Sequence, residues 1–380
     1  MSDTDALVIG AGPAGLACAA MLGEQGLRSV ILEKAATVGA VWRRHYDRLH
    51  LHTDRGHSGL PGLPMPRDYP RYPSRAQVVA YLESYAAHFE LRPEFGSAAR
   101  AVLRTEHGWR VETPRRAWNA PIVVIATGWA DFPHVPAWPG QAQYRGDVIH
   151  SSSYRNPAPY AGRRVLVVGF GNSGGEIALD LADAGVDTTL AVRSPVCILP
   201  RELLGLPILT WAVSQAALPP ALADALNAPA IRLAVGSIER LGLVKASKGP
   251  RRMIAEDRKI PLLDIGTVAA IRAGRIKVRG GIGHFTAEGV AFEPSPATGG
   301  KAVTEAFDAV ILATGFRPDL RTLLPGTPEA LDAQGQPRVT GAAAAPGLFF
   351  CGQSPSPTGQ LREIGIEARR IARLAAALPR

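Results

Sequence analysis

Two glycine-rich stretches have the residue spacing that brings a backbone up against a diphosphate group. Each carries three glycines in the order G-x-G-x-x-G after a short apolar run: Gly10, Gly12 and Gly15 in the first, and Gly169, Gly171 and Gly174 in the second. In this motif the first glycine makes a tight turn, the second lets the backbone approach a pyrophosphate, and the third packs a helix closely on a strand. The spacing therefore predicts two dinucleotide sites.

Each motif needs a β-α-β unit to position it, and the sequence supplies one on both occasions. Residues 6–34 and 165–194 both run from a β-branched apolar segment through the glycine turn into an Ala/Leu-rich helix and a second apolar segment. An alanine recurs at an identical offset in both copies, as Ala19 and Ala178. Two glycine turns without any ligand are the alternative, which the extended match disfavours. The other candidate contacts in the two turns are Pro13, Ala14, Asn172 and Ser173.

The two units differ in the charge at the end of their second strand. Glu33 ends the first, where a carboxylate can accept hydrogen bonds from ribose hydroxyls, and Lys34 follows it. Arg193 ends the second, where a guanidinium would instead pair with a 2′-phosphate, and Ser194 adds a hydroxyl donor. The second site is therefore expected to prefer NADPH over NADH. A solvated surface arginine is the alternative interpretation of Arg193.

Three later apolar segments are predicted to be further buried strands of the same nucleotide units. Residues 120–129 and 307–316 both end just after Ala-Thr-Gly, and residues 347–354 contain a third strand before a long final helix. The pattern predicts an α/β protein with two Rossmann-like domains of the glutathione-reductase type, one inserted into the other. The turn residues added to the candidate sites are Ala126, Thr127, Gly128, Ala313, Thr314, Gly315, Gly352 and Gln353.

Composition argues against several other classes of protein. The formal net charge is +9 at pH 7, but the basic residues are scattered without a polybasic run, so nucleic-acid binding is not expected. Cys18, Cys197 and Cys351 are far apart in sequence and form no C-x-x-C pair, so neither a dithiol centre nor a metal site is expected. The N-terminal stretch has no basic leader, and the apolar residues 203–220 are interrupted by a proline and a glutamine. A cytoplasmic protein without stable membrane insertion is expected.

The stretch between the two glycine motifs carries the sequence that identifies a family. Tyr144, Gly146, His150 and Tyr154 stand at the spacing F-x-G-x-x-x-H-x-x-x-F/Y, with tyrosine in place of the usual first phenylalanine. Together with segments such as VGAVWRRHYDRLHLHT, GFGNSGGEIALDLA and FDAVILATGFRP, this stretch resembles the flavin-containing monooxygenases, most of all their YUCCA-type group. The resemblance covers nearly the whole chain. It implies that the stretch connects an FAD domain to an NADPH domain, with His150 in a structural or hinge role.

The resemblance assigns FAD to the first site and NADPH to the second. It implies an FAD-binding domain of residues 1–155 and 318–380. The NADPH-binding domain then spans residues 156–317 and contains a helical insertion of residues 199–258. Further expected FAD contacts are Trp42, Arg43, Leu49, His52, Thr53 and Ala99, and Tyr72 is an expected NADPH contact. In the insertion, ordinary helix packing is the simpler interpretation of the residues that could otherwise line a substrate channel: Leu206, Leu209, Trp211 and Val213.

The implied chemistry is that of a monooxygenase that uses FAD, NADPH and O2. NADPH would reduce the flavin, O2 would give a C4a-(hydro)peroxyflavin, and one oxygen atom would enter a small organic substrate. That substrate is expected to be a 2-oxo acid or ketone such as indole-3-pyruvate, or a soft nitrogen or sulfur nucleophile. Mammalian-type members carry an asparagine after the tryptophan segment, and residues 49–59 contain none. His52 and Thr53 therefore become catalytic candidates beside Asn172, and a homodimer is one expected assembly.

Three alternative functions share parts of this pattern. Ser173 lies in G-N-S-G-G, which also fits the nucleophile turn G-x-S-x-G of a serine hydrolase, with Asp264 and His284 in the matching chain order. A flavin disulfide reductase would need a cysteine pair near the flavin, which the sequence does not offer. An NADPH-oxidising flavoprotein that acts as a sensor or reductase, without productive oxygenation, fits the same cofactor motifs.

Overall fold

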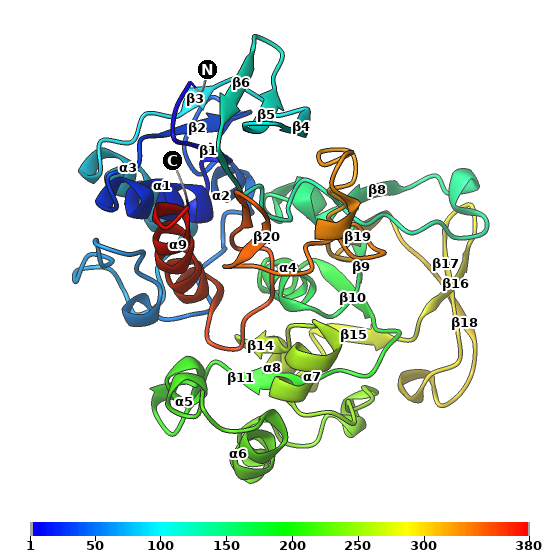
Figure 1. The fold of residues 1–380 in the computed structure, drawn as a ribbon. Helices are drawn as coiled ribbons and strands as arrows, with labels where there is room; N and C mark the ends of the chain where they lie inside the picture. The colour runs from blue at the N-terminus through cyan, green and yellow to red at the C-terminus, as the bar shows by residue number, and fades with distance from the viewer. Residues whose placement is uncertain (1–2, 379–380) are drawn as a thin grey trace. The chain divides into compact units, whose positions relative to one another are not determined.

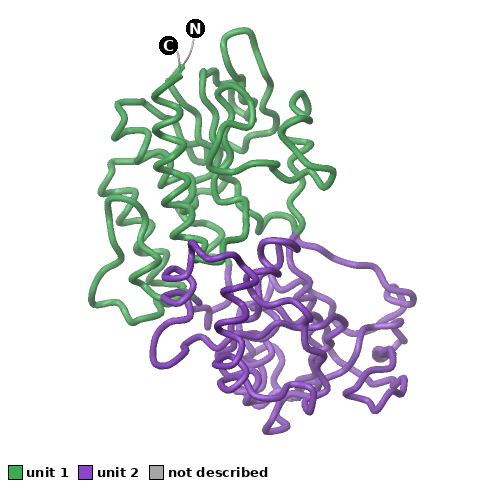
Figure 2. Tube along the Cα trace, turned by 60° about the horizontal axis from the view of Figure 1, so that its bottom comes forward, with its two compact units in different colours: residues 1–44, 53–132, 317–380 green, residues 45–52, 133–316 purple. Residues whose placement is uncertain are grey.

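The computed structural model describes residues 3–378 and divides the chain into two compact units. The first unit comprises residues 1–44, 53–132 and 317–380, and the second comprises residues 45–52 and 133–316 (Figure 2). The second unit therefore interrupts the first in sequence, and each unit is built on its own parallel sheet. The predicted α/β fold, with one nucleotide-binding domain inserted into another, is confirmed.

The first unit is built on a six-stranded sheet in the order β20-β21-β7-β1-β2-β3. Every neighbouring pair is parallel except β20 with β21. All four residues of β1 are buried apolar side chains, as expected for a parallel strand that is covered on both faces. The strands are β1 (Ala6–Ile9), β2 (Ser29–Glu33), β3 (Glu94–Phe95), β7 (Ile122–Ile125), β20 (Ala343–Ala345) and β21 (Leu348–Phe350).

Helices and a small sheet complete the first unit. Helix α1 (Pro13–Glu24) starts directly after the glycine turn, and its many Ala and Gly residues allow α9 (Gln360–Ala376) to pack closely along it (Figure 1). Helix α3 (Arg75–His88) begins at a capping box in which Ser74 and Gln77 each bond the other's backbone N–H. The remaining elements are α2 (Ala40–Arg44) and an antiparallel sheet of β4 (Ala101–Thr105), β5 (Gly108–Glu112) and β6 (Ala117–Ala120).

The second unit is built on a five-stranded parallel sheet in the order β15-β10-β9-β19-β8. Helix α4 (Asn172–Asp183) follows the second glycine turn and packs on β9 and β10, with α8 (Thr267–Arg272) beside it. A three-stranded antiparallel sheet of β16 (Ile282–Phe285), β17 (Gly289–Phe292) and β18 (Val303–Ala306) precedes β19. The parallel strands are β8 (Asp147–His150), β9 (Arg164–Val168), β10 (Asp187–Ala191), β15 (Ile276–Arg279) and β19 (Ala309–Leu312).

The second unit begins earlier in the sequence than the predicted domain border at residues 155 and 156. Strand β8 pairs in parallel with β19, from Asp147 opposite Ala309 to His150 opposite Leu312. Residues 133–155 therefore fall in the second unit rather than the first. Residues 45–52 also belong to the second unit, although they lie deep inside the predicted FAD domain. Both differences arise from pairings between residues that are distant in the sequence.

The segment predicted as a helical insertion contains short strands followed by three helices. These helices are α5 (Ile208–Ser214), α6 (Pro220–Val235) and α7 (Pro250–Asp257). Asp224 on α6 acts as a cap for α7, because its carboxylate accepts hydrogen bonds from the backbone N–H groups of Arg251 at 2.9 Å and Arg252 at 3.0 Å. The strands are β11 (Ile198–Pro200), which pairs with β14 (Leu262–Asp264), and β12 (Glu202–Leu203), which pairs with β13 (Leu206–Pro207).

Candidate functional site

The first glycine turn is tightly packed against the protein at Gly10 and Gly15, but it leaves open space at Gly12. A Cβ atom added to Gly15 would lie 1.8 Å from the carbonyl oxygen of Gly10, and one added to Gly10 would lie 2.6 Å from that of Ala126. Gly10 also has a φ of 110°, which side chains rarely adopt. A Cβ on Gly12, by contrast, would meet no atom within 4 Å, although Gly12 is the residue before α1. The space above Gly12 fits a group from outside the chain, such as a diphosphate at the helix N-terminus.

The second glycine turn has nearly the same distances and φ values as the first. A Cβ on Gly174 would lie 1.9 Å from the oxygen of Gly169, and one on Gly169 would lie 2.6 Å from the oxygen of Ala313. Gly169 has a φ of 104°, and a Cβ on Gly171 would again meet no atom within 4 Å. The predicted pairing of each glycine motif with an Ala-Thr-Gly strand is thus realised within each unit. The two turns are built alike, and both leave the middle glycine open.

The ends of the Ala-Thr-Gly strands have matching conformations. Gly128 and Gly315 both have a positive φ, 66° and 80°, and a Cβ on either would meet no atom within 4 Å. Thr314 donates from its hydroxyl to the carbonyl of His134 at 2.5 Å. Thr127 instead accepts a hydrogen bond from Gln353 at 3.2 Å. The threonine is therefore committed to the protein backbone in the second unit, whereas in the first it binds a polar side chain.

Glu33 is the last residue of β2, whereas Arg193, predicted to end its strand, lies two residues beyond the end of β10 at Ala191. The Glu33 carboxylate is buried and accepts backbone N–H groups from Ala11 at 2.7 Å and Ala35 at 2.8 Å. It therefore supports the glycine turn and keeps further lone pairs for a ribose. Arg193 is exposed, like Ser194 after it, and its guanidinium forms no hydrogen bond or ion pair with any residue that the structure describes. A guanidinium in this state is available to an anionic ligand.

Lys34 and Arg43, both predicted FAD contacts, form ion pairs within the protein. The Lys34 ammonium pairs with Asp131 at 2.7 Å, a carboxylate that also pairs with Arg44 at 3.1 Å. Arg43, on α2 beside the half-buried Trp42, pairs with Glu83 of α3 and donates to the carbonyl of Val38 at 3.3 Å. Both cations are thus paired with carboxylates of their own unit.

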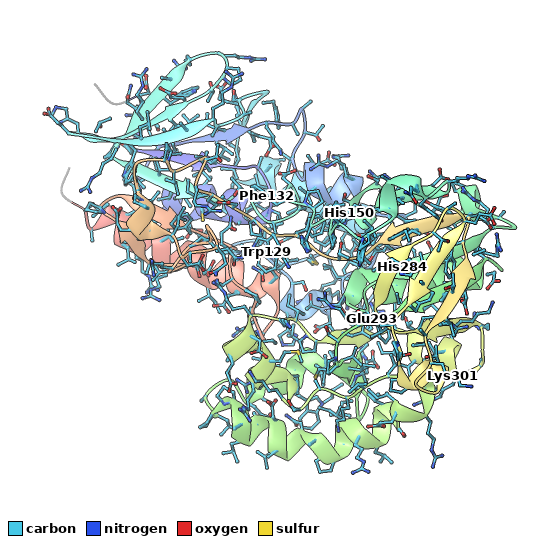
Figure 3. The ribbon with its side chains drawn as sticks, turned by 90° about the vertical axis from the view of Figure 1, so that its right-hand side faces the viewer. Trp129, Phe132, His150, His284, Glu293 and Lys301 are labelled. Atoms are coloured by element: carbon cyan, nitrogen blue, oxygen red, sulfur yellow. The ribbon has the colours of Figure 1, made fainter. Side chains whose placement is uncertain are left out.

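Buried polar atoms without hydrogen-bond partners lie after β7, after β21 and at the start of α9 in the first unit. Gln353 is 2% exposed, and its Oε1 atom has no hydrogen-bond partner among the described residues. The same holds for Gln360 Oε1 at the start of α9 and for the indole N–H of Trp129, which directly follows Gly128 (Figure 3). A buried polar atom without a partner is unfavourable, so these atoms fit a ligand with both donor and acceptor groups, such as a flavin nucleotide.

Trp129 and Gln360 were not identified from the sequence. Trp129 had a local signal, because it is the next residue after an Ala-Thr-Gly strand end, but tryptophan is also common in cores. Gln360 follows Gly359 at a helix start, and only its buried, unpartnered oxygen distinguishes it from an ordinary first-turn residue. Gly352, which was predicted, donates its backbone N–H to the buried Glu367 at 2.7 Å and has a φ of 73°.

The predicted flavin contacts outside the turns fall in both units. Thr53 belongs to the first unit, where its hydroxyl bonds that of Ser58 at 2.7 Å, and Ala99 packs against the core of that unit. Tyr72, expected at the NADPH site, is half-buried in the first unit as well. Leu49 and His52 belong to the second unit, where Leu49 packs on the main core. The structure thus does not bring all of these residues together within one unit.

His52 contacts a buried carboxylate that lies 124 residues away in the sequence. Its Nε2 atom lies 3.1 Å from Oε2 of Glu176, a residue of α4 that is 2% exposed. The same carboxylate oxygen accepts a hydrogen bond from the Tyr46 hydroxyl at 2.8 Å. Asn172, at the start of α4, accepts the backbone N–H of Leu263 at 2.8 Å through its side-chain oxygen. Its amide N–H2 group remains for a ligand.

The four residues of the family motif all lie in the second unit and stabilise the end of its sheet. Tyr144 donates to the carbonyl of Phe307 at 2.9 Å, and a Cβ on Gly146 would lie 2.4 Å from the Tyr144 hydroxyl. His150 bonds the carbonyl of Gly315 through Nε2 at 3.0 Å (Figure 3), and burial lowers its pKa. Tyr154 donates to Asp180 of α4 at 2.8 Å. The motif therefore fixes the Ala-Thr-Gly turn after β19 against β8 and α4.

The residues of the hydrolase alternative do not form a catalytic triad. His284 is exposed on β16 (Figure 3), and Asp264 accepts backbone N–H groups of Gly266 and Val268 at the start of α8. Within the described part of the chain, neither side chain forms a hydrogen bond to Ser173. The hydrolase interpretation of G-N-S-G-G is therefore wrong for this chain.

Two of the cysteines are closer in space than their sequence separation suggested. Cys18 on α1 and Cys351 after β21 are fully buried, with their side chains in contact. This contact and burial together raise the pKa of the Cys351 thiol well above its usual range. Because the thiolate is the reactive form of cysteine, Cys351 is poorly suited to thiol redox chemistry. Among the helices of residues 3–378, none is both long and apolar enough to cross a membrane.

Comparison with known proteins agrees with this geometry. A family model described as pyridine nucleotide-disulphide oxidoreductase matches residues 7–198. The indole-3-pyruvate monooxygenase YUCCA1 of Oryza sativa subsp. japonica is 38% identical over 345 residues, which cover 88% of this chain and 82% of the relative. The indole-3-pyruvate monooxygenase YUCCA6 of Arabidopsis thaliana is 39% identical over 337 residues, 84% of this chain and 78% of the relative.

A solved structure extends the similarity to the whole fold. The flavin-containing monooxygenase from Stenotrophomonas maltophilia superimposes with a TM-score of 0.74 and 27% sequence identity, over 99% of both chains. Sequence and structure thus point in the same direction from independent comparisons. The chain belongs to the flavin-containing monooxygenases and, within them, to the group of the YUCCA indole-3-pyruvate monooxygenases.

Proposed function

We propose that this flavin-dependent monooxygenase, which uses FAD, NADPH and O2, converts a 2-oxo acid such as indole-3-pyruvate to the carboxylic acid one carbon shorter. The observation that carries the proposal is the pair of open glycine turns, one beside Glu33 and the other beside the unpaired Arg193. The substrate class is supported by the two curated relatives, which are both named indole-3-pyruvate monooxygenases.

In this proposal FAD is held by the first unit. The open turn at Gly12 and the N-terminus of α1 receive its diphosphate, and Glu33 accepts its ribose hydroxyls. The unpartnered atoms Trp129 Nε1, Gln353 Oε1 and Gln360 Oε1 bond the polar edges of the bound group. Trp42, Thr53 and Ala99 complete the proposed set of FAD contacts in this unit.

NADPH is held by the second unit in the same way. The turn at Gly171 and the N-terminus of α4 receive its diphosphate, and Arg193 with Ser194 pairs with the 2′-phosphate. The free amide group of Asn172 is placed at the start of the same helix and is proposed to bond the nicotinamide end. With this assignment, the proposed NADPH-binding domain is the unit of residues 45–52 and 133–316.

In this proposal the protein positions the cofactors and substrate and shields them from water, rather than supplying an acid-base pair. When bound, FAD would supply the oxygen chemistry, through the C4a-(hydro)peroxyflavin that the family resemblance implies. The balanced reaction consumes the 2-oxo acid, O2, NADPH and a proton, and yields the shorter acid, CO2, NADP+ and water. The role of the protein is to exclude bulk water and stray protons while the substrate carbonyl is attacked.

The test is a stoichiometric assay on the purified holoenzyme. With indole-3-pyruvate we expect faster NADPH oxidation, and one CO2 and one indole-3-acetate for each NADPH consumed. A cyclic ketone and an alkyl sulfide serve as comparison substrates for the other two reaction classes. If none of the three substrates raises the rate and all O2 is recovered as H2O2, the oxygenase proposal fails and an NADPH-oxidising sensor or reductase takes its place.

A further inference from the structure

The parallel sheet of the second unit connects to its small antiparallel sheet through two consecutive glycines. Gly280 directly follows β15 and Gly281 directly precedes β16. Strand β10 ends beside this junction, because the backbone N–H of Val192 donates to the carbonyl of Arg279 at 2.9 Å. Strand β17 ends there as well, because the backbone N–H of Glu293 donates to the carbonyl of Gly281 at 2.8 Å. The residues that follow β10 and β17 are therefore brought together at the two glycines.

The side chains of Arg193 and Glu293 both pack against Gly281. A Cβ atom added to Gly281 would lie 2.8 Å from Oε2 of Glu293, 3.1 Å from Cγ of Arg193 and 3.4 Å from Cβ of Arg193. The space that a larger residue would fill is thus shared by a carboxylate oxygen and the aliphatic part of an arginine. Glu293 is therefore a close neighbour of the residue proposed to bind the 2′-phosphate.

The charges of Arg193 and Glu293 are close together but are not paired. Both side chains are exposed, and neither head group forms a hydrogen bond or an ion pair with any residue that the structure describes (Figure 3 labels Glu293). The neighbouring Arg279 differs, because its guanidinium pairs with Glu305 at 2.5 Å. A bound nucleotide at the end of β10 would therefore meet an available cation and, beside it, an available anion.

A carboxylate beside the arginine affects the two nicotinamide cofactors in opposite directions. The 2′-phosphate of NADPH carries nearly two negative charges at neutral pH, so Glu293 repels it while Arg193 attracts it. The 2′-hydroxyl of NADH is neutral and can donate a hydrogen bond to a carboxylate. The carboxylate therefore opposes the preference for NADPH that the guanidinium creates.

We propose that Glu293 is a specificity-determining residue that limits the preference of the second unit for NADPH over NADH. Its carboxylate repels the 2′-phosphate of NADPH and accepts a hydrogen bond from the 2′-hydroxyl of NADH. The inference rests on the proposed function, because it takes the second unit as the site of the nicotinamide cofactor. Its consequence is that removal of one exposed negative charge tightens the binding of NADPH.

The experiment compares two ligands that differ only in the 2′-phosphate. Dissociation constants of NADP+ and NAD+ are measured by calorimetry on the FAD-loaded protein, at low and at high salt. Glu293→Gln keeps the size of the side chain but removes its charge, and it is expected to tighten NADP+ binding by about threefold to tenfold at low salt. Binding of NAD+ should weaken by about twofold, because a charged acceptor is replaced by a neutral one. High salt screens exposed charges, so the gain for NADP+ should shrink there.

Two further variants separate this explanation from others. Glu288→Gln removes an exposed carboxylate just before the other end of β17, which lies 3.9 Å from Arg145, and it should change neither dissociation constant. In a protein that already carries Arg193→Ala, Glu293→Gln should still tighten NADP+ binding by a similar factor, because repulsion of the phosphate does not require the guanidinium. Since Glu293 is exposed and unpaired among the described residues, its replacement is not expected to disturb folding.

Several results would overturn the inference. Weaker or unchanged NADP+ binding in Glu293→Gln would show that the carboxylate orients the guanidinium or has no effect on the phosphate. An equal gain for NAD+, a gain that high salt does not reduce, or a gain that disappears in the Arg193→Ala protein would exclude direct repulsion of the 2′-phosphate. If the unaltered protein binds neither ligand, the proposed function itself fails.

Discussion

Replacement of Arg193 by alanine should change cofactor choice without changing the fold. The side chain is exposed and has no partner among the described residues, so the free energy of unfolding should stay within about 0.5 kcal/mol of the original. Hydrogen bonds to a charged group are worth about 1.5–3 kcal/mol, and a guanidinium forms two with a phosphate. Loss of this interaction should raise the KM for NADPH by about tenfold to a hundredfold. The KM for NADH, which has no 2′-phosphate, should change less than about twofold.

The assay follows NADPH and NADH oxidation at several cofactor concentrations under the same conditions. Arg193→Lys keeps the charge but loses the two-pronged geometry, so its KM for NADPH should lie between those of the other two proteins. Arg240→Ala, which removes another exposed arginine of the second unit, is the control for a nonspecific loss of positive charge. Higher salt should weaken NADPH binding to the unaltered protein and reduce the difference between the variants.

The outcome that would refute this reasoning is an equal rise of both KM values. Such a rise would show that Arg193 supports the turn or the diphosphate rather than the 2′-phosphate. A KM for NADPH that matches that of the Arg240→Ala control would show that the guanidinium is a solvated surface group. In either case the preference for NADPH would need another source.

Three further perturbations test separate parts of the structure. Gly12→Val should give folded but colourless protein, because the added Cβ atom meets no protein atom within 4 Å and the side chain takes the space of the diphosphate. Full flavin content with normal melting would contradict this. Asp224→Ala should lower the free energy of unfolding by about 1–2 kcal/mol, because it removes the carboxylate that caps α7. Denaturant titrations measure this change, and an unchanged midpoint would argue against the cap. The lowered pKa of His150 means that the unfolded chain binds this proton more readily. Stability should therefore be complete above about pH 6.5 and fall as the pH drops below it, and His150→Gln should flatten that decline in melting curves.

Local rules were sufficient for the two nucleotide turns. The spacing of Gly10, Gly12 and Gly15 reflects contacts within a few residues, such as the 1.8 Å approach of a Gly15 Cβ to the Gly10 oxygen. Such contacts can be recognised in a sequence because each of them excludes a side chain. The family motif could be recognised in the same way, although its place in the second unit could not, since it depends on the pairing of β8 with β19.

The features that sequence reasoning missed depend on residues far apart in the chain. Tyr46 and Glu176, which share a hydrogen bond, are 130 residues apart. Lys34 and Asp131 lie in different segments of the first unit, and nothing near Lys34 indicates that its charge is already paired. The unpartnered oxygen of Gln353 is likewise a property of packing, because the residue type alone predicts an exposed side chain.

Residues 45–52 belong to the second unit but lie between two segments of the first, and this affects any attempt to produce one unit alone. A polypeptide that spans only residues 133–316 would lack Tyr46, which belongs to the apolar interior of that half, and would leave Glu176 without either of its donors. Neither unit is one continuous stretch of the sequence, so simple truncation is expected to give insoluble products. A rearranged chain in which residues 45–52 are joined to residues 133–316 would allow nucleotide binding by the second unit to be studied in isolation.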